Sequence, residues 1–166
     1  MGQPGGREPS NADDRIYMRI QALHEMRKQM TKLCTARVCM GGNIEEFSGR
    51  FPGIMEEALL ALEAKQPIYL SGLVGGATRQ IIDAIRYTKK KMPDDFAIAE
   101  KAIQKATKKH EPSPMTPAAL WQKFSSYNLS RLSRLNRLTT IENKRLFDAV
   151  TPHEVFSLVT LGLSRI

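Results

Sequence analysis

The stretch ARVCMGGNIEEFSGRFPGIMEEALL, residues 36–60, decides the fold class. Its first five residues form a short apolar run that ends at Gly41-Gly42, which is typical of a buried strand entering a tight loop. After the loop, Pro52 precedes apolar residues at helical spacing, and proline is favoured in the first turn of a helix. The stretch therefore predicts a strand, a glycine-rich loop and a helix.

The same alternation continues on both sides of this stretch. Apolar residues at steps of three and four predict a helix over residues 13–33. Residues 66–72 are interpreted as a second strand, and Gly75-Gly76 as the start of a helix that closes in the three lysines of residues 89–91. Alternation of this kind predicts an α/β fold, a Rossmann-like parallel sheet with helical crossovers. The sheet is expected to be partial, because open sheets usually have about four to six strands.

The remainder of the chain is expected to be helical. A polar helix is predicted at about residues 94–109, and residues 129–138, with an arginine at every third position, are interpreted as a 3₁₀ or irregular basic loop because that period drifts around an α-helix. Thr139 with Glu142 and Thr151 with Glu154 have the spacing of capping boxes. We therefore expect a disordered tail at 1–12 and one domain at 13–166, with a helical insertion at about 92–138.

Composition limits the function classes. The 166-residue chain fits one domain, and no apolar run is long enough to span a membrane. With only Cys34 and Cys39 and no leader-like start, the sequence predicts a cytoplasmic protein with reduced thiols. No His, Cys or Asp cluster has metal-ligand spacing, so neither a metal nor a cofactor is predicted. Of the net charge of +8, residues 101–166 carry +7, from 11 basic and 4 acidic residues.

The segment from Gly41 to Glu57 is the candidate ligand loop. A strand end joined to a helix start through glycines presents free backbone N–H groups and the positive end of the helix dipole, which favours phosphate. Arg50 can add a bidentate phosphate contact. This geometry predicts a loop that binds phosphate; the alternative is that the glycines only make turns.

The same residues resemble a known family. The helix sequence LHEMRKQM at 23–30, the strand at 36–40, Gly41-Gly42 and the pattern Gly53-Ile54-x-x-Glu57 are similar in order and spacing to the motifs of LOG-type proteins and of the wider SLOG superfamily. The resemblance covers residues 13–91. It implies a Rossmann-like nucleotide-binding domain.

The resemblance implies either of two activities. LOG enzymes release a nucleobase from a nucleoside monophosphate, and their catalytic arginine and glutamate correspond to Arg27 and Glu57, although the arginine position itself holds Met26. Ile54 replaces the motif threonine, and about nine residues are inserted after the glycine pair. We therefore expect non-enzymatic binding or sensing of a ligand such as an ADP-ribose derivative. The expected ligand-binding residues are Gly41, Gly42, Asn43, Gly49, Arg50, Pro52, Gly53, Ile54, Glu57, Gly72, Gly75 and Gly76.

Neighbouring residues receive less weight as site residues. Glu56 and Glu57 point in different directions on a helix, so at most one is expected to face the crevice, and the motif position selects Glu57. His24, beside Glu25, is interpreted as a partly exposed structural histidine.

Two expectations concern partners. The family's amino-terminal half has no counterpart before residue 13, so we expect a homo-oligomer or a partner that supplies the missing half; no membrane partner is expected. A weaker alternative is nucleic-acid binding through residues 123–145. Its cations would be Arg131, Arg134 and Arg137, and its stacking residues Trp121, Phe124 and Tyr127.

Overall fold

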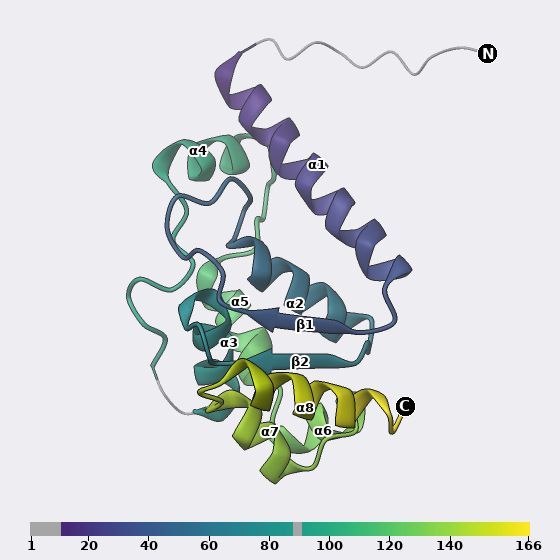
Figure 1. The fold of residues 1–166 in the computed structure, drawn as a ribbon. Helices are drawn as coiled ribbons and strands as arrows, with labels where there is room; N and C mark the ends of the chain where they lie inside the picture. The colour runs from purple at the N-terminus through teal and green to yellow at the C-terminus, as the bar shows by residue number, and fades with distance from the viewer. Residues whose placement is uncertain (1–10, 88–90) are drawn as a thin grey trace, which may run out of the picture.

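The computed structural model describes residues 11–87 and 91–166 as an α/β domain (Figure 1). Its elements, in chain order, are α1 Ala12–Leu33, β1 Arg37–Met40, α2 Gly53–Glu63, β2 Ile68–Ser71, α3 Gly76–Arg86, α4 Lys101–His110, α5 Pro117–Ser125, α6 Leu129–Asn136, α7 Thr140–Phe147 and α8 Pro152–Leu163. The predicted tail falls outside the described residues up to position 10. Asn11 caps α1, because its side chain accepts a hydrogen bond from the Asp14 N–H at the helix start, so residues 11 and 12 are not part of a disordered tail.

The two predicted strands pair in parallel, which confirms the α/β fold and the parallel sheet. Arg37 lies opposite Ile68 and Met40 opposite Ser71. Within the part of the chain that the structure describes, β1 pairs with no strand other than β2. The outer edge of β1 is therefore open.

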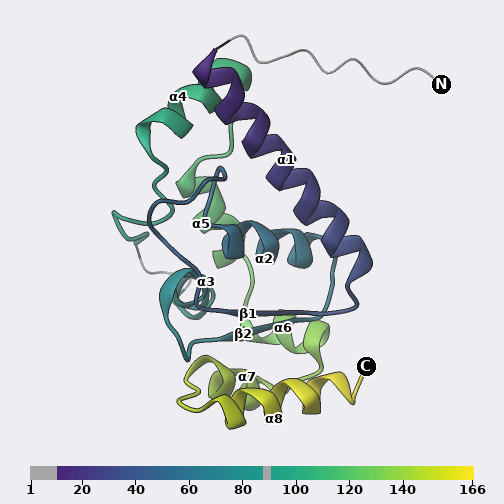
Figure 2. The ribbon, with the colours of Figure 1, turned by 45° about the horizontal axis from the view of Figure 1, so that its top comes forward.

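Helices cover both faces of the sheet (Figure 2). Cys39, Ile68 and Leu70 point into the larger core, which α2, α3 and α5 complete. Tyr69 points to the opposite face and into a second core with α7 and α8. On that face the β1 residues Val38 and Met40 stay exposed, because the carboxyl-terminal helices contact β2 and leave β1 uncovered.

Local signals fix the carboxyl-terminal helices. The capping box of Thr139 and Glu142 is confirmed, since each side chain bonds the other residue's backbone N–H. At α8 the expected capping box is half formed: Thr151 accepts from the Glu154 N–H, while the Glu154 carboxylate accepts from Arg145. The buried Asn136 side chain donates to the Ile68 carbonyl and so attaches the end of α6 to β2.

Residues 129–136 form an α-helix, so the interpretation of 129–138 as a 3₁₀ or irregular loop was wrong. Asn128 caps the helix by accepting from the Arg131 N–H, and Arg137 ends it with a left-handed backbone. The arginine period of three drifts by about 60° per step, but a helix of eight residues needs only a short buried face. Leu132 and Asn136, four residues apart, can therefore both be buried.

Two other predicted helices have different bounds. The polar helix begins at Lys101 rather than 94, because the chain turns at Phe96 and Ala97 and buries both residues. The helix that opens at Gly76 ends at Arg86, before the three lysines; of these, Lys91 is not helical, and positions 89 and 90 lie outside the described residues.

Among residues 11–87 and 91–166, no helix has both the length and the apolar character needed to cross a bilayer. The same ranges contain no group of three or more His, Cys, Asp or Glu residues placed to hold a metal ion.

Candidate functional site

The glycine pair after β1 caps α3. Gly41 and Gly42 have φ angles of 68° and 94°, which are strained for residues with a side chain. Their carbonyls accept from the first N–H groups of α3, at 2.9 Å from Thr78 to Gly41 and 2.9 Å from Ala77 to Gly42. Those two donors are thus occupied by the protein itself. The glycines bring the start of α3 against the end of β1.

The start of α2 keeps free donors. Pro52 occupies the N-cap position and provides no side-chain bond, while its carbonyl accepts from the Met55 and Glu56 N–H groups. The N–H groups of Gly53 and Ile54 have no hydrogen-bond acceptor among the described residues. Two unsatisfied N–H groups at a helix amino terminus form the kind of site that binds anions. This position lies beyond the carboxyl end of the parallel strand β1, where ligands of open α/β sheets bind.

Gly42 separates the two helix starts. A methyl group added to Gly42 would lie 2.7 Å from the Ile54 side chain and 3.1 Å from that of Ala77. The starts of α2 and α3 therefore converge on the same point of the loop. Gly76 lies against the same glycine pair, whereas a methyl at Gly75 would meet open space.

A buried charge cluster lies beneath the loop. The Arg27 guanidinium of α1 donates to the Glu56 carboxylate of α2, and His24 Nδ1 lies 2.6 Å from the other Glu56 oxygen. Glu57 accepts from Arg37 at 2.6 Å, and its other oxygen lies 3.7 Å from Arg27 Nε. Arg27 and Glu56 are 9% and 7% exposed. Both carboxylates are therefore engaged by arginines, and burial makes those pairs costly to break.

The loop glycines give this cluster its space. A methyl at Gly53 would lie 2.8 Å from Arg27 Nη2, and a methyl at Gly49 3.2 Å from Nη1. Glycine at 49 and 53 thus lets the loop lie directly on the guanidinium. Arg27 therefore lies beneath the start of α2.

Glu56 is the residue that sequence reasoning underweighted. Glu57, chosen by motif position, approaches Arg27 at 3.7 Å but bonds Arg37 more closely, whereas Glu56 takes the direct bond from Arg27. Arg27 thus contacts both glutamates, Glu56 directly and Glu57 at 3.7 Å. His24 and Arg27 are three residues apart on one face of α1, and that spacing was the available signal.

Arg50 and Asn43 have protein partners of their own. Arg50 donates to Glu111, the residue that ends α4, and Glu111 also accepts from Tyr17 and Gln21 of α1. Burial, with the adjacent Glu111 carboxylate, raises the pKa of Tyr17. The Asn43 side chain accepts from the Glu45 N–H in a local turn. The guanidinium of Arg50 is therefore directed at α1 and α4.

Gly72 has a packing role in the structure. A methyl at this position would collide with the carbonyl of Phe147 at the end of α7. The glycine allows the chain after β2 to pass close to α7.

The candidate nucleic-acid-binding segment, residues 123–145, lacks the expected stacking surface. Trp121 and Phe124 are buried in the larger core, and the Tyr127 ring is covered by Arg131, whose guanidinium lies 4.1 Å from the ring centroid. The prediction that these three rings are available for stacking was wrong for the two buried ones. Their helical spacing on α5 reflects the core.

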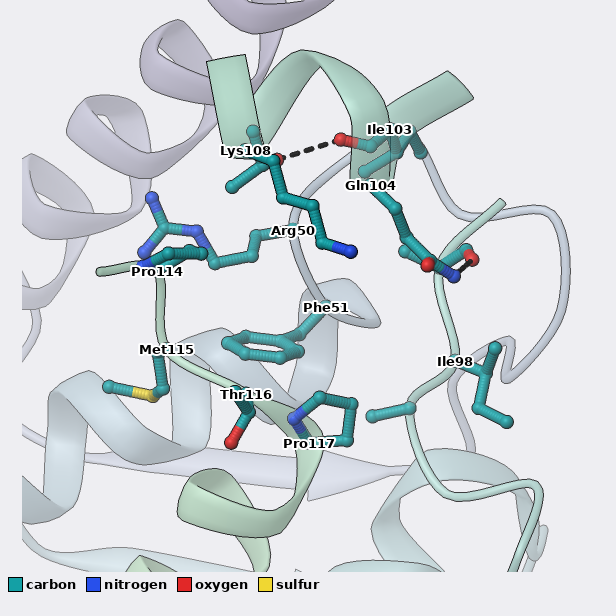
Figure 3. A pocket seen from close by; sticks show the side chains of 13 residues that line it. Arg50, Phe51, Ile98, Ile103, Gln104, Lys108, Pro114, Met115, Thr116 and Pro117 are labelled. Carbon is teal, nitrogen blue, oxygen red and sulfur yellow. Dashed lines mark hydrogen bonds between the residues drawn. The ribbon is translucent and has the colours of Figure 1, made fainter. Parts of the chain in front are cut away.

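A pocket of about 270 Å³ adjoins the loop (Figure 3). Phe51 and the stem of Arg50 form one wall, and α4, residues 97–99 and residues 114–117 complete it. Sequence reasoning did not identify this pocket, because its walls come from segments about 50 residues apart.

Comparison with known proteins identifies the family of this chain. Residues 5–146 match the family model described as SLOG cluster2. The chain belongs to the SLOG cluster2 family. No curated protein and no solved structure matches it.

The family match has two consequences. It confirms the resemblance to the SLOG superfamily, and it supports a function related to nucleotides in general. The matched range continues through the helices of residues 92–138 and into α7, so it includes the walls of the pocket as well as the loop.

Proposed function

We propose that this SLOG domain binds a nucleotide-derived ligand, a nucleotide or an ADP-ribose-like molecule, at the β1–α2 loop and does not turn it over. The observation that carries the proposal is the pair of unbonded N–H groups at Gly53 and Ile54, at the carboxyl end of β1. A ligand phosphate would accept from these donors and gain from the dipole of α2.

Charge pairing favours binding over catalysis. A carboxylate that acts as nucleophile or base needs a free oxygen directed at the substrate. Glu56 is shared between Arg27 and His24, and Glu57 between Arg37 and Arg27. In this arrangement the glutamates hold the arginines in place beneath the loop.

The second candidate function is a phosphoribohydrolase that uses Arg27 and Glu57. The 3.7 Å approach between Arg27 Nε and Glu57 favours it, because the two groups lie beneath the same helix start. Incubation with AMP followed by analysis for free adenine separates the candidates. We expect no adenine above the level of a protein-free blank; release that depends on Glu57 would support the enzyme.

Arg50 provides the sharpest test of the binding site. In our proposal Arg50 exchanges Glu111 for the ligand phosphate, a charge-assisted contact worth roughly 1.5–3 kcal/mol. Arg50→Ala should therefore weaken binding of ADP-ribose or AMP about ten- to a hundredfold in titration calorimetry. Arg50→Lys should recover part of the loss, because lysine keeps the charge and lacks the planar fork.

Matched variants separate ligand contact from the ion pair. Glu111→Gln removes the same pair but leaves Arg50 in place, so it should keep or strengthen binding. Arg134→Ala, in the basic segment, should change affinity little. Normal binding by Arg50→Ala together with a large loss in Arg134→Ala would locate the site in the carboxyl-terminal region and contradict the proposal.

We also propose that the chain associates with a second copy or with a partner chain. The open edge of β1 and the exposed side chains of Val38 and Met40 support this, since unpaired strand edges readily accept another strand. Light scattering after size exclusion should give a mass above 18.7 kDa; a single monomeric species with a cooperative melt would contradict it.

A further inference from the structure

The pocket beside the β1–α2 loop has an apolar lining and one unpaired cation. Eight of its thirteen lining residues are apolar, three are uncharged polar residues, two are cations and none is a carboxylate. Phe51, Ile98, Ile103 and Met115 provide the large apolar surfaces (Figure 3). Such a lining suits an apolar body, and its charge suits an anion.

The polar side chains of the lining are already bonded to the protein. Gln104 Nε2 donates to the Ala99 carbonyl at 2.5 Å, and Thr107 Oγ1 donates to that of Ile103 at 2.8 Å. Thr116 Oγ1 accepts from the Ala119 N–H. A nucleobase buried here would leave several ring nitrogens unpaired, which is costly. The pocket therefore differs in chemistry from the nucleotide site proposed above.

Lys108 is the free charge at this pocket. Its ammonium group extends from α4 over the middle of the pocket. The Arg50 guanidinium points away from the pocket, past Pro114 toward Glu111 (Figure 3). Among residues 11–87 and 91–166, Lys108 has neither an ion pair nor a hydrogen bond from its side chain. Its neighbour Lys109, in contrast, is paired with Asp14 at 2.8 Å. An anion in the pocket would meet an uncompensated cation.

The volume limits the occupant. A cavity of about 150 Å³ accommodates one benzene ring, so about 270 Å³ has room for one or two fused rings and is smaller than usual drug-sized sites. The Phe51 ring on the wall favours an aromatic body, because offset or edge-to-face ring pairs add to the burial of apolar area.

We propose that this pocket is a second binding site, for a small aromatic carboxylate of one or two rings. The ring body lies against Phe51, Ile103 and Met115, and the carboxylate accepts from Lys108. The pocket shares the stem of Arg50 with the proposed nucleotide site, but its ligand is held by other groups and the proposal does not depend on the nucleotide function.

The test uses two probes with the same ring system. The acid 1-naphthoate and the neutral alcohol 1-naphthalenemethanol are titrated into the full chain at low ionic strength. We expect the acid to bind more tightly than the alcohol by about two- to fivefold, the magnitude of a partly exposed charge contact. Lys108→Met should remove this preference while leaving binding of the alcohol unchanged.

Two further variants serve as the control and as an independent check. Lys101→Met removes an exposed cation of α4 that does not line the pocket, and it should behave like the parent. Ile98→Glu places a carboxylate on the partly exposed wall and should weaken binding of the acid more than that of the alcohol.

Methyl NMR spectra of methionine-labelled protein show where naphthoate binds. The Met115 signal, assigned through Met115→Leu, should shift on addition of naphthoate. No binding of naphthoate at millimolar concentration, an unmoved Met115 signal, or an acid preference that persists in Lys108→Met would each overturn the proposal.

Discussion

Removal of Arg27 should destabilise the protein more than any exposed charge substitution. Arg27→Met leaves the buried Glu56 with only His24 as a partner and removes one neighbour of Glu57. Breaking one side of a buried ion pair typically costs about 3–5 kcal/mol. Because a domain's total stability is roughly 5–15 kcal/mol, the variant should lose about a fifth of its stability or more.

A double-mutant cycle isolates the pair itself. Glu56→Gln alone leaves Arg27 with only the longer Glu57 contact and should also cost several kcal/mol. In the double variant neither charge is left uncompensated, so its loss should be smaller than the sum of the single losses by about 2 kcal/mol or more. Urea unfolding followed by the fluorescence of the single, buried Trp121 gives the free energies.

The exposed pair of Lys28 and Glu25 is the matched control on the same helix. Its nitrogen-to-oxygen distance is 2.8 Å, but its side chains are 41% and 54% exposed, so Lys28→Met should cost well under about 1 kcal/mol. The reasoning fails if Arg27→Met costs no more than Lys28→Met, or if the two single losses add fully in the double variant.

Three further outcomes are expected. Burial raises the pKa of Cys39 to about 12, so at pH 8 only the exposed Cys34 should react quickly with a thiol reagent, and two equivalents should react after unfolding. The hydrogen bond from Arg165 lowers the pKa of Glu142 from 4.5 to about 2. The stability that this shift adds is present above the pKa of the carboxyl in the unfolded chain and is lost as the pH falls toward 2. The melting temperature of Glu142→Gln should therefore fall less steeply than that of the parent as the pH is lowered. Gly72→Ala should lower the melting temperature by several degrees, since its methyl would collide with a backbone carbonyl of α7 and overpacking costs about 1–3 kcal/mol; an unchanged melt would show that α7 moves freely.

Local signals in the sequence were sufficient for the two strands, their pairing and several helix starts. The apolar run at 36–40 and Gly41-Gly42 predicted β1 and its loop, and the alternation of helix and strand predicted the parallel pairing that the structure has. Caps such as that of Thr139 and Glu142 act within four residues of chain, so they were readable directly. The resemblance also identified the SLOG superfamily, to which the family match assigns the chain.

Helix bounds needed more than periodicity. The period-three arginines argued against an α-helix at 129–138, but the neighbouring caps and the burial of Leu132 against the core favoured one over eight residues. Conversely, a helix was predicted from about residue 94, but Phe96 is buried by a turn that precedes the helix. Tertiary burial outweighs propensity when a segment is this short.

Tertiary structure alone decided which charges meet. The sequence offered Arg27 and two adjacent glutamates, but only the crossing of α1 over α2 gives the direct bond to Glu56 and leaves Glu57 to Arg37. Likewise Arg50 finds Glu111, 61 residues later, rather than the helix start beside it. Which side chains share a helix face follows from their spacing in the sequence. Which side chains from distant segments meet depends on how the helices and strands pack, and no spacing along the chain specifies that packing.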